Sequence, residues 1–258
     1  MQVDIIDLRD FYTSQLGMRT RAYLRVALSA HISNAKGMEI AGVGFANPYL
    51  GTFRSDANRL ISLMPAVQGC VNWPSKGPNA SVLVDEDMLP IPNAALDRVF
   101  LIHALEFSPH PARLLDEVWR VLAPGGRVLV VVPNRRGLLA RVDSTPFGHG
   151  RPFSKGQLIR LCRSTQFSPT AWSEALHFFP FDNKMALRTA AFFERFGQTL
   201  LSPLGGVIIL EATKHMFKGM PVSDGVRVAA KPVLVPAGAV QRVKDLSLRM
   251  PERAHGRA

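Results

Sequence analysis

Cysteine is scarce in this chain of 258 residues, and its scarcity argues against two kinds of structural site. Cys70 and Cys162 are far apart in the sequence and match no zinc-binding spacing, so neither a disulfide framework nor a metal site is predicted. We expect both cysteines to be reduced and buried. Long apolar runs are also lacking, because the longest, such as VLVVVP, are too short to span a bilayer.

The start of the chain lacks the layout of a signal peptide. Its opening residues, MQVDIIDLRDF, contain acidic side chains and no basic segment followed by an apolar one. With no transmembrane segment expected either, the sequence predicts a soluble, cytoplasmic protein.

Acidic residues are outnumbered by basic ones, which gives a net charge of +11 and an isoelectric point of about 10.3. Such a charge attracts anionic partners, whether nucleic acid, lipid or small molecules. However, no Lys/Arg run is interleaved with aromatic residues, so the usual pattern of single-strand binding is missing. Most of the charge is therefore interpreted as solvated surface, and a nucleic-acid partner is not favoured.

Short apolar segments alternate with helical patterns along the chain. Between the segments, SPHPARLLDEVWRVLAPGG shows apolar residues three and four apart, with Ser108 as a cap, Pro109 in the first turn and a stop at Pro124. This alternation predicts an α/β fold: a Rossmann-like, doubly wound, mostly parallel sheet of about seven strands with helices on both faces. The expected strands lie in MEIAG, RLISLM, SVLVD, DRVFLIH, GRVLVVVP and GVIILEA.

We expect three regions in the chain. Residues 1–35 form an N-terminal helical lid, and residues 36–220 form the Rossmann-like domain, which includes a basic, glycine-rich loop at 134–153. Residues 221–258 form a basic C-terminal extension that is partly disordered.

A set of ordered motifs lies in residues 84–134, VDEDMLPIPNAALDRVFLIHALEFSPHPARLLDEVWRVLAPGGRVLVVVPN. These are an acid, Leu-Pro, Asp-x-Val, His-x-Leu-Glu and Arg-Val-Leu-x-Pro-Gly-Gly. A glycine turn precedes them in GMEIAGVGFANPYLG, residues 37–51. Together they resemble the class I S-adenosylmethionine-dependent methyltransferases of the type 11 group, which implies S-adenosylmethionine as the cofactor.

The resemblance implies a cofactor site around the glycine turn and the strand ends that follow it. Bare main chain at the turn would leave a hollow for the cofactor, because a Cβ would occupy the space of a ligand. Side chains such as Phe45 or Met64 within that hollow would contradict this expectation. The implied cofactor-binding residues are Glu39, Gly42, Gly44, Ala46, Met64, Asp85, Glu86, Met88 and His103.

Two departures from the family pattern concern the cofactor. Glu39 lies three residues before Gly42 rather than two, and Ala46 replaces the third glycine. In addition, the second strand ends in Leu63-Met64-Pro65, where the family commonly has an acid for the ribose hydroxyls. A missing acceptor of this kind costs on the order of 1.5–3 kcal/mol, or roughly ten- to a hundredfold in binding.

His103 and Glu106 follow the fourth expected strand, where the family presents the donor methyl group, and they are the candidate catalytic residues. A histidine there can take a proton from a hydroxyl acceptor. Alternatively, His103 is a packed strand-end residue, since methyl transfer often needs only the positioning of two bound reactants. Asp97 is interpreted as ordering a turn.

The basic loop follows the fifth expected strand and is the candidate acceptor site. Its cations suit a carboxylate or phosphate of the acceptor, and the alternative is an exposed loop tied down by Asp143. The candidate substrate-binding residues are Arg135, Arg136, Arg141, His149 and Arg151.

Three functions stay open at this point. The first is methyl transfer from S-adenosylmethionine to a small or medium-sized, anionic acceptor. The second is a methyltransferase-like module with weakened or lost cofactor binding that acts as an interaction or regulatory protein. The third is a nucleic-acid methyltransferase, which depends on charge alone, because VPNRR lacks the Asn-Pro-Pro-Tyr type of motif.

Overall fold

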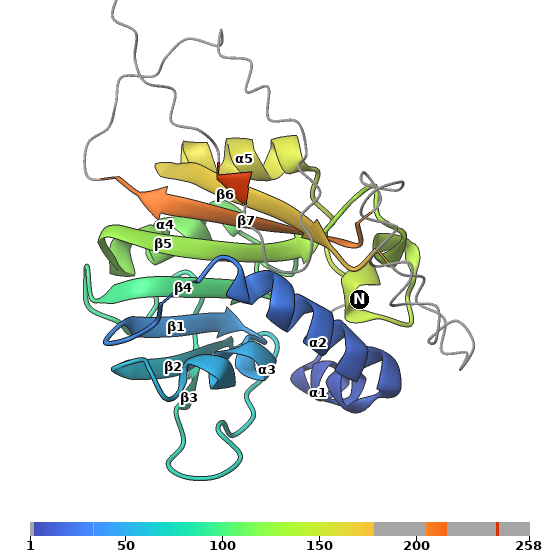
Figure 1. The fold of residues 1–258 in the computed structure, drawn as a ribbon, viewed down its shortest axis with the longest axis horizontal. Coiled ribbons are helices and arrows are strands. Elements are labelled where there is room, and N and C mark those ends of the chain that lie inside the picture. The colour runs from blue at the N-terminus through green and yellow to red at the C-terminus, as the bar shows by residue number, and fades with distance from the viewer. Residues whose placement is uncertain (1–2, 33, 178–204, 216–240, 243–258) are drawn as a thin grey trace, which may run out of the picture.

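The computed structural model describes residues 3–32, 34–177, 205–215 and 241–242. They form an eight-stranded sheet in the order β3-β2-β1-β4-β5-β7-β6-β8 (Figure 1). Strands β1 to β5 are parallel, whereas β7 is antiparallel to both β5 and β6. This confirms the predicted doubly wound, mostly parallel sheet. The strands are β1 (Glu39–Gly44), β2 (Arg59–Pro65), β3 (Ser81–Val84), β4 (Leu96–Ile102), β5 (Leu122–Pro133), β6 (Phe167–Ala175), β7 (Val207–Lys214) and β8 (Gln241–Arg242).

Helices cover both faces of the sheet and create two apolar cores (Figure 1). The α4 side of the sheet is packed by Leu114, Leu115, Val118 and Val121, which form one buried stripe along α4. The other core contains buried residues of α1, α2 and α3. The helices are α1 (Ile5–Thr13), α2 (Gln15–Ser29), α3 (Asn47–Leu50), α4 (Pro111–Val121) and α5 (Lys155–Ser164).

The start of α4 differs from the prediction. The helix begins at Pro111 with His110 as its cap residue, two positions later than expected. The Ser108 hydroxyl is engaged elsewhere, because it donates to Glu86 Oε1 (2.6 Å) and accepts from the His110 amide (3.2 Å).

The N-terminal segment forms two helices rather than one. Ser14 has an extended backbone conformation between them, and its hydroxyl accepts from the Gly17 amide at the start of α2. This break turns α1 toward the end of β1, while α2 crosses the face of the sheet (Figure 1). The backbone amide of Ile5 donates to the carbonyl of Gln68, which ties α1 to the loop after β2.

The outer strands of the parallel half carry less cover than the central ones. Residues 66–80 and 85–95, all of which are described, connect β2 to β3 and β3 to β4 without a helix. Val82 and Leu83 on β3 are therefore exposed.

Other predictions meet the structure in part. Cys162 is buried as expected, but Cys70 is exposed, and both thiols are free. None of the helices in the described part of the chain is long and apolar enough to cross a membrane. The predicted C-terminal extension lies outside the described residues, apart from 241–242.

Candidate active site at the carboxyl edge of the sheet

The carboxyl ends of the parallel strands meet at one edge of the sheet. Gly44 is paired with Ile102, and Pro65 with Val84, so the segments after β1, β2, β3 and β4 leave the sheet side by side. The chain order reverses between β1 and β4, and α/β sheets bind ligands outside the strand ends at such a point. This edge is the candidate site.

The glycine turn is explained by packing against the chain itself. Gly44 has a φ of +83°, and a Cβ there would collide with the Ile102 and His103 carbonyl oxygens. A Cβ on Gly42 would lie 2.5 Å from the Cβ of Ala46, at the start of α3. The two glycines therefore allow β1, α3 and the turn after β4 to approach closely.

Buried side chains cover the glycine turn in the described arrangement. Phe45 and Met64 are only 4% and 0% exposed, and both belong to the apolar core under the N-terminal helices. The Phe45 amide donates to the Ile102 carbonyl (2.8 Å), and the Val71 amide lies 3.3 Å from the Met64 sulfur. This packing departs from the expected bare turn, because α1 brings Tyr12 against the Phe45 ring, at 5.6 Å between centroids.

A buried polar chain leads from α3 through α1 to the turn after β4. The Tyr49 hydroxyl donates to that of Tyr12 (2.9 Å), which lies 2.8 Å from Nε2 of His103. Nδ1 of His103 in turn lies 3.2 Å from Glu106 Oε1. His103 itself has a φ of +52°, a conformation rare for residues other than glycine and found more often at functional sites.

The donor-to-acceptor direction of these hydrogen bonds assigns the tautomer of His103. The Tyr12 hydroxyl receives the Tyr49 proton, so its own proton is directed to Nε2 of His103. Burial, followed by the neighbouring Tyr49, raises the pKa of Tyr12 well above its ordinary value, so Tyr12 stays a donor. With Nε2 as the acceptor, the ring N–H of His103 is Nδ1–H, on the side of Glu106.

Three buried polar atoms in this cluster have no hydrogen-bond partner among the described residues. They are Gln68 Oε1, His103 Nδ1 and Glu106 Oε2. They belong together, because Gln68 donates through Nε2 to the His103 carbonyl (2.7 Å). Buried polar atoms are nearly always paired, so such a group marks a place that is built for more than packing.

The acidic segment after β3 lies at the same edge. Asp85 is exposed, and its Oδ1 accepts from the Asp87 amide (2.9 Å) in a local turn. Glu86 is buried, and this burial raises its pKa even though the Ser108 hydroxyl donates to it. Met88 is 71% exposed. Asp85 and Met88 are thus free to contact a ligand, whereas Glu86 is engaged within the protein.

Glu39 does not lie with the other candidate residues. It is the first residue of β1, at the amino end, where its carboxylate accepts from the side-chain Nδ2 of Asn58 and lies 3.4 Å from the Arg59 guanidinium. The Glu39 backbone amide donates to Asp97, which agrees with the ordering role predicted for Asp97. We therefore leave Glu39 out of the proposed site.

The basic loop follows β5 at the same edge, and its two ends are bridged by Asn134 and Phe153. Its four arginine candidates are exposed and His149 is half-buried. Within the described residues, neither these arginines nor Asp143 forms an ion pair, so a loop tied down by Asp143 is not observed. The four are Arg135, Arg136, Arg141 and Arg151.

Sequence reasoning missed Tyr12, Tyr49 and Gln68. Tyr12 lies 91 positions before its partner His103, and no local pattern announces such a contact. Gln68 was detectable in principle, since it is the first amide-bearing side chain after the second strand, where the acid is missing.

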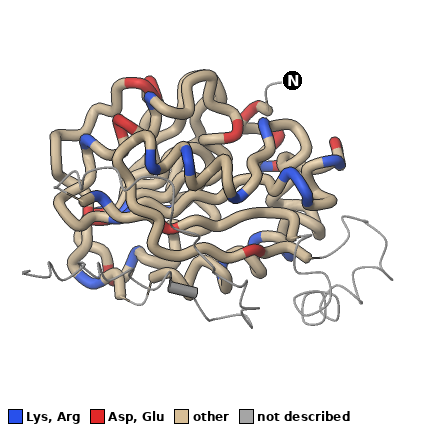
Figure 2. Tube along the Cα trace, turned by 90° about the horizontal axis from the view of Figure 1, so that it is seen from above, with Lys and Arg blue, Asp and Glu red and all other residues tan. Residues whose placement is uncertain are grey.

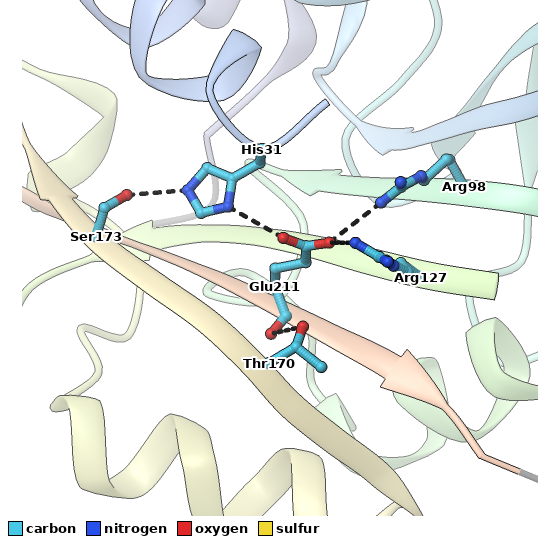
Figure 3. A network of polar contacts seen from close by, with 6 residues as sticks. All are labelled: His31, Arg98, Arg127, Thr170, Ser173 and Glu211. Carbon is cyan, nitrogen blue, oxygen red and sulfur yellow. Dashed lines mark hydrogen bonds and ion pairs between the residues drawn. The ribbon is translucent and has the colours of Figure 1, made fainter. Parts of the chain in front are cut away.

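A second buried polar cluster lies under α2, away from the carboxyl edge (Figure 3). Glu211 on β7 contacts Arg98, Arg127 and His31 at 3.3, 2.6 and 3.4 Å, and His31 also contacts the Ser173 hydroxyl. Burial favours the neutral form of Glu211, but hydrogen bonds from His31 and Arg127 outweigh it and hold the pKa at about 2. In this cluster each oxygen of the carboxylate has a partner.

Comparisons with known proteins agree with this fold. The type 11 family model, described as "Methyltransferase domain", matches residues 42–130. An uncharacterized protein of Methanocaldococcus jannaschii is 29% identical over 119 residues, which are 45% of this chain and 53% of that protein. This chain therefore spans about half the length of that curated relative.

Solved structures show the same fold at low identity. A methyltransferase of Archaeoglobus fulgidus has a TM-score of 0.55 and 16% identity, with 75% of this chain and 94% of that one covered. A methyltransferase of Thermotoga maritima has a TM-score of 0.51 and 14% identity, with 80% and 99% covered. Both are S-adenosylmethionine-dependent according to their descriptions. The match of residues 42–130 to the family model and the shared fold agree with the resemblance seen in residues 84–134.

Proposed function

We propose that this protein transfers a methyl group from S-adenosylmethionine to a small or medium-sized, anionic acceptor. The observation that carries the proposal is the group of unpaired buried atoms of Gln68, His103 and Glu106 at the carboxyl edge, within a chain that matches the methyltransferase family. When bound, S-adenosylmethionine supplies a methyl group on a positively charged sulfur.

The residues after β2 and β3, at the carboxyl edge of the sheet, have the chemistry to bind this cofactor. Asp85 and Met88 are exposed after β3, and Asp85 offers a carboxylate oxygen to an amino group while Met88 offers apolar surface. Gln68 Oε1 is an acceptor near the end of β2 that can replace part of the missing acid. The Gly42–Ala46 turn would present its backbone to the cofactor, and Met64 lies in the apolar core beside it.

The other side of the edge is covered by α1. Tyr12 lies between Phe45 and His103, so the ligand must displace α1 or share the edge with the Tyr12 hydroxyl. In the described arrangement Nε2 of His103 already receives the Tyr12 proton and is not free as a base. His103 and Glu106 act on an acceptor only once Tyr12 has moved; otherwise they hold the turn and position the reactants.

A second candidate is a methyltransferase-like module that binds no cofactor. The burial of Phe45 and Met64 beside the glycine turn favours it, as does the run of Leu63, Met64 and Pro65 at the end of β2. A nucleic-acid methyltransferase is less well supported, because Lys and Arg are scattered along the described chain instead of gathering in one place in the view of Figure 2.

The test is calorimetric titration of the purified protein with S-adenosylhomocysteine. We expect saturable binding that weakens roughly tenfold in Asp85→Asn, because one charged acceptor is lost while the turn to Asp87 is kept. Asp116→Asn removes another exposed carboxylate, on α4, and should leave the affinity unchanged. No heat and no thermal shift at millimolar ligand would support the module without a cofactor.

A further inference from the structure

A cavity of about 300 Å³ lies where the basic loop meets the two helices on the α4 side of the sheet. Its size is at the lower end of the range for small-molecule sites. It is open on one side, and its walls combine apolar side chains with two arginines. The lining residues are Pro111, Ala112, Arg135, Arg151, Pro152, Phe153, Gln157 and Leu161.

The charge of this cavity is of one sign. Arg135 and Arg151 both line it, whereas no acidic residue does. Arg135 uses one guanidinium nitrogen to donate to the Pro152 carbonyl (3.2 Å), and neither arginine forms an ion pair within the described residues. A planar guanidinium with free donors suits the two oxygens of a carboxylate or phosphate.

The backbone holds the two arginines in place although they are sixteen positions apart in the sequence. The Arg135 amide donates to the Phe153 carbonyl (2.9 Å), and the Phe153 amide donates to the Pro133 carbonyl (3.0 Å). The Arg151 amide donates to the carbonyl of Glu106 (2.8 Å). The cavity is therefore attached directly to the turn that carries the candidate catalytic residues.

The start of α4 adds to the positive potential of the cavity. Pro111 and Ala112 form the first turn of this eleven-residue helix, which has no side-chain cap and no acidic residue in that turn. A helix N-terminus carries a partial positive charge, so it favours the same kind of ligand as the arginines.

We infer that this cavity binds the carboxylate or phosphate of the methyl acceptor, with an apolar or aromatic portion of the acceptor against Phe153 and Leu161. This inference rests on the proposed function, and it specifies where the acceptor binds and through which residues. Of the five basic candidates in the loop, Arg135 and Arg151 bind the anionic group. Arg136, Arg141 and His149 do not line the cavity and are not required.

The test uses benzoate and phenyl phosphate as probes and benzyl alcohol as the neutral control, titrated into the full chain by calorimetry. We expect millimolar or tighter binding of at least one anion and none of the alcohol. Arg135→Gln combined with Arg151→Gln should weaken anion binding at least tenfold. Arg163→Gln, which removes an exposed arginine of α5 outside the cavity, should change it less than twofold. Preference for one anion over the other decides between carboxylate and phosphate.

The same samples are titrated with S-adenosylhomocysteine to separate this inference from the proposed function. Binding of S-adenosylhomocysteine that is unchanged in the double variant, with anion binding lost, supports both. Equal anion binding by wild type and double variant, or none by either, overturns the cavity assignment and leaves the methyltransferase proposal standing. Anion binding without any binding of S-adenosylhomocysteine overturns the proposed function instead.

Discussion

The chain contains two buried polar clusters that differ in how completely they are paired. Around Glu211, a carboxylate meets Arg98, Arg127 and His31, and its pKa is held at about 2. Around His103, the contacts to Tyr12 and Glu106 leave several buried atoms without a hydrogen bond. Both clusters lie on the side of the sheet that α1 and α2 cover.

This difference distinguishes a structural cluster from a candidate site. The Glu211 cluster joins β4, β5 and β7 to the end of α2, and pairing its charges compensates their removal from water. The His103 cluster keeps three buried polar atoms without a hydrogen bond among the described residues, and it holds His103 at a positive φ. We therefore expect the first to control stability and the second to control ligand binding.

The largest effect is expected from Glu211→Ala. It leaves the half-buried Arg98 without its carboxylate, and breaking a largely buried pair in this way costs up to about 3–5 kcal/mol of unfolding free energy. Urea denaturation measures the change. The matched control is Asp10→Ala, which breaks the exposed Arg9–Asp10 pair and should cost less than about 1 kcal/mol. Similar losses in the two variants would contradict the structural role of the Glu211 cluster.

The pH dependence of stability provides a second test of this cluster. Because the folded pKa of Glu211 is depressed from 4.5 to about 2, its contribution is complete above pH 4.5 and is lost as the pH falls toward 2. Glu211→Gln lacks the charge and the titration. The difference in Tm between wild type and Glu211→Gln should therefore shrink over this interval, with Arg98, Arg127 and His31 facing the position in both proteins. A constant difference would show that the carboxylate charge is not the cause.

Gly44→Ala tests the turn that supports His103. The alanine would have to keep the positive φ of Gly44, and its Cβ would collide with the Ile102 carbonyl oxygen. We therefore expect the free energy of unfolding to fall by about 2 kcal/mol or more. Gly125→Ala is the control, because Gly125 has a similar φ of +75° but open space around its Cβ position, and should cost about 1 kcal/mol. Thermal unfolding distinguishes them, and equal losses would mean that backbone strain alone explains Gly44.

The smallest effect on stability is expected from Tyr12→Phe. It leaves the Tyr49 hydroxyl and Nε2 of His103 without their partner, a cost of about 1–2 kcal/mol. Tyr49→Phe removes only the last hydroxyl of this hydrogen-bonded series and should cost less stability. If α1 covers the cofactor site, Tyr12→Phe should also strengthen binding of S-adenosylhomocysteine, whereas weaker binding would make Tyr12 part of the site.

Most of the sheet was predictable because buried parallel strands form nearly continuous apolar runs. The six expected strands correspond to β1, β2, β3, β4, β5 and β7. Strand β6 was missed because Pro169, Ser168 and Ser173 interrupt its pattern, and its pairing with β7 depends on distant residues. The start of α4 was misplaced because Pro109 and Pro111 both suit a first helical turn, and local sequence does not choose between them.

The site was predictable only where it depends on chain order. Asp85, His103 and the basic loop follow consecutive strands, so their common edge follows from the topology. Which side chains pack against the glycine turn was not predictable, since this depends on how α1 packs. Glycine is required at positions 44 and 42 because a Cβ there would collide with the Ile102 carbonyl oxygen and the Ala46 Cβ, respectively.

The attachment of α1 has a practical consequence for purification tags. Val3 is buried and the Ile5 amide donates to the Gln68 carbonyl, so a peptide fused to the N-terminus joins the chain only a few residues before α1, which lies against the edge where the cofactor is proposed to bind. A bulky fusion there competes with the seating of the helix, so binding constants should be measured after the tag has been cleaved.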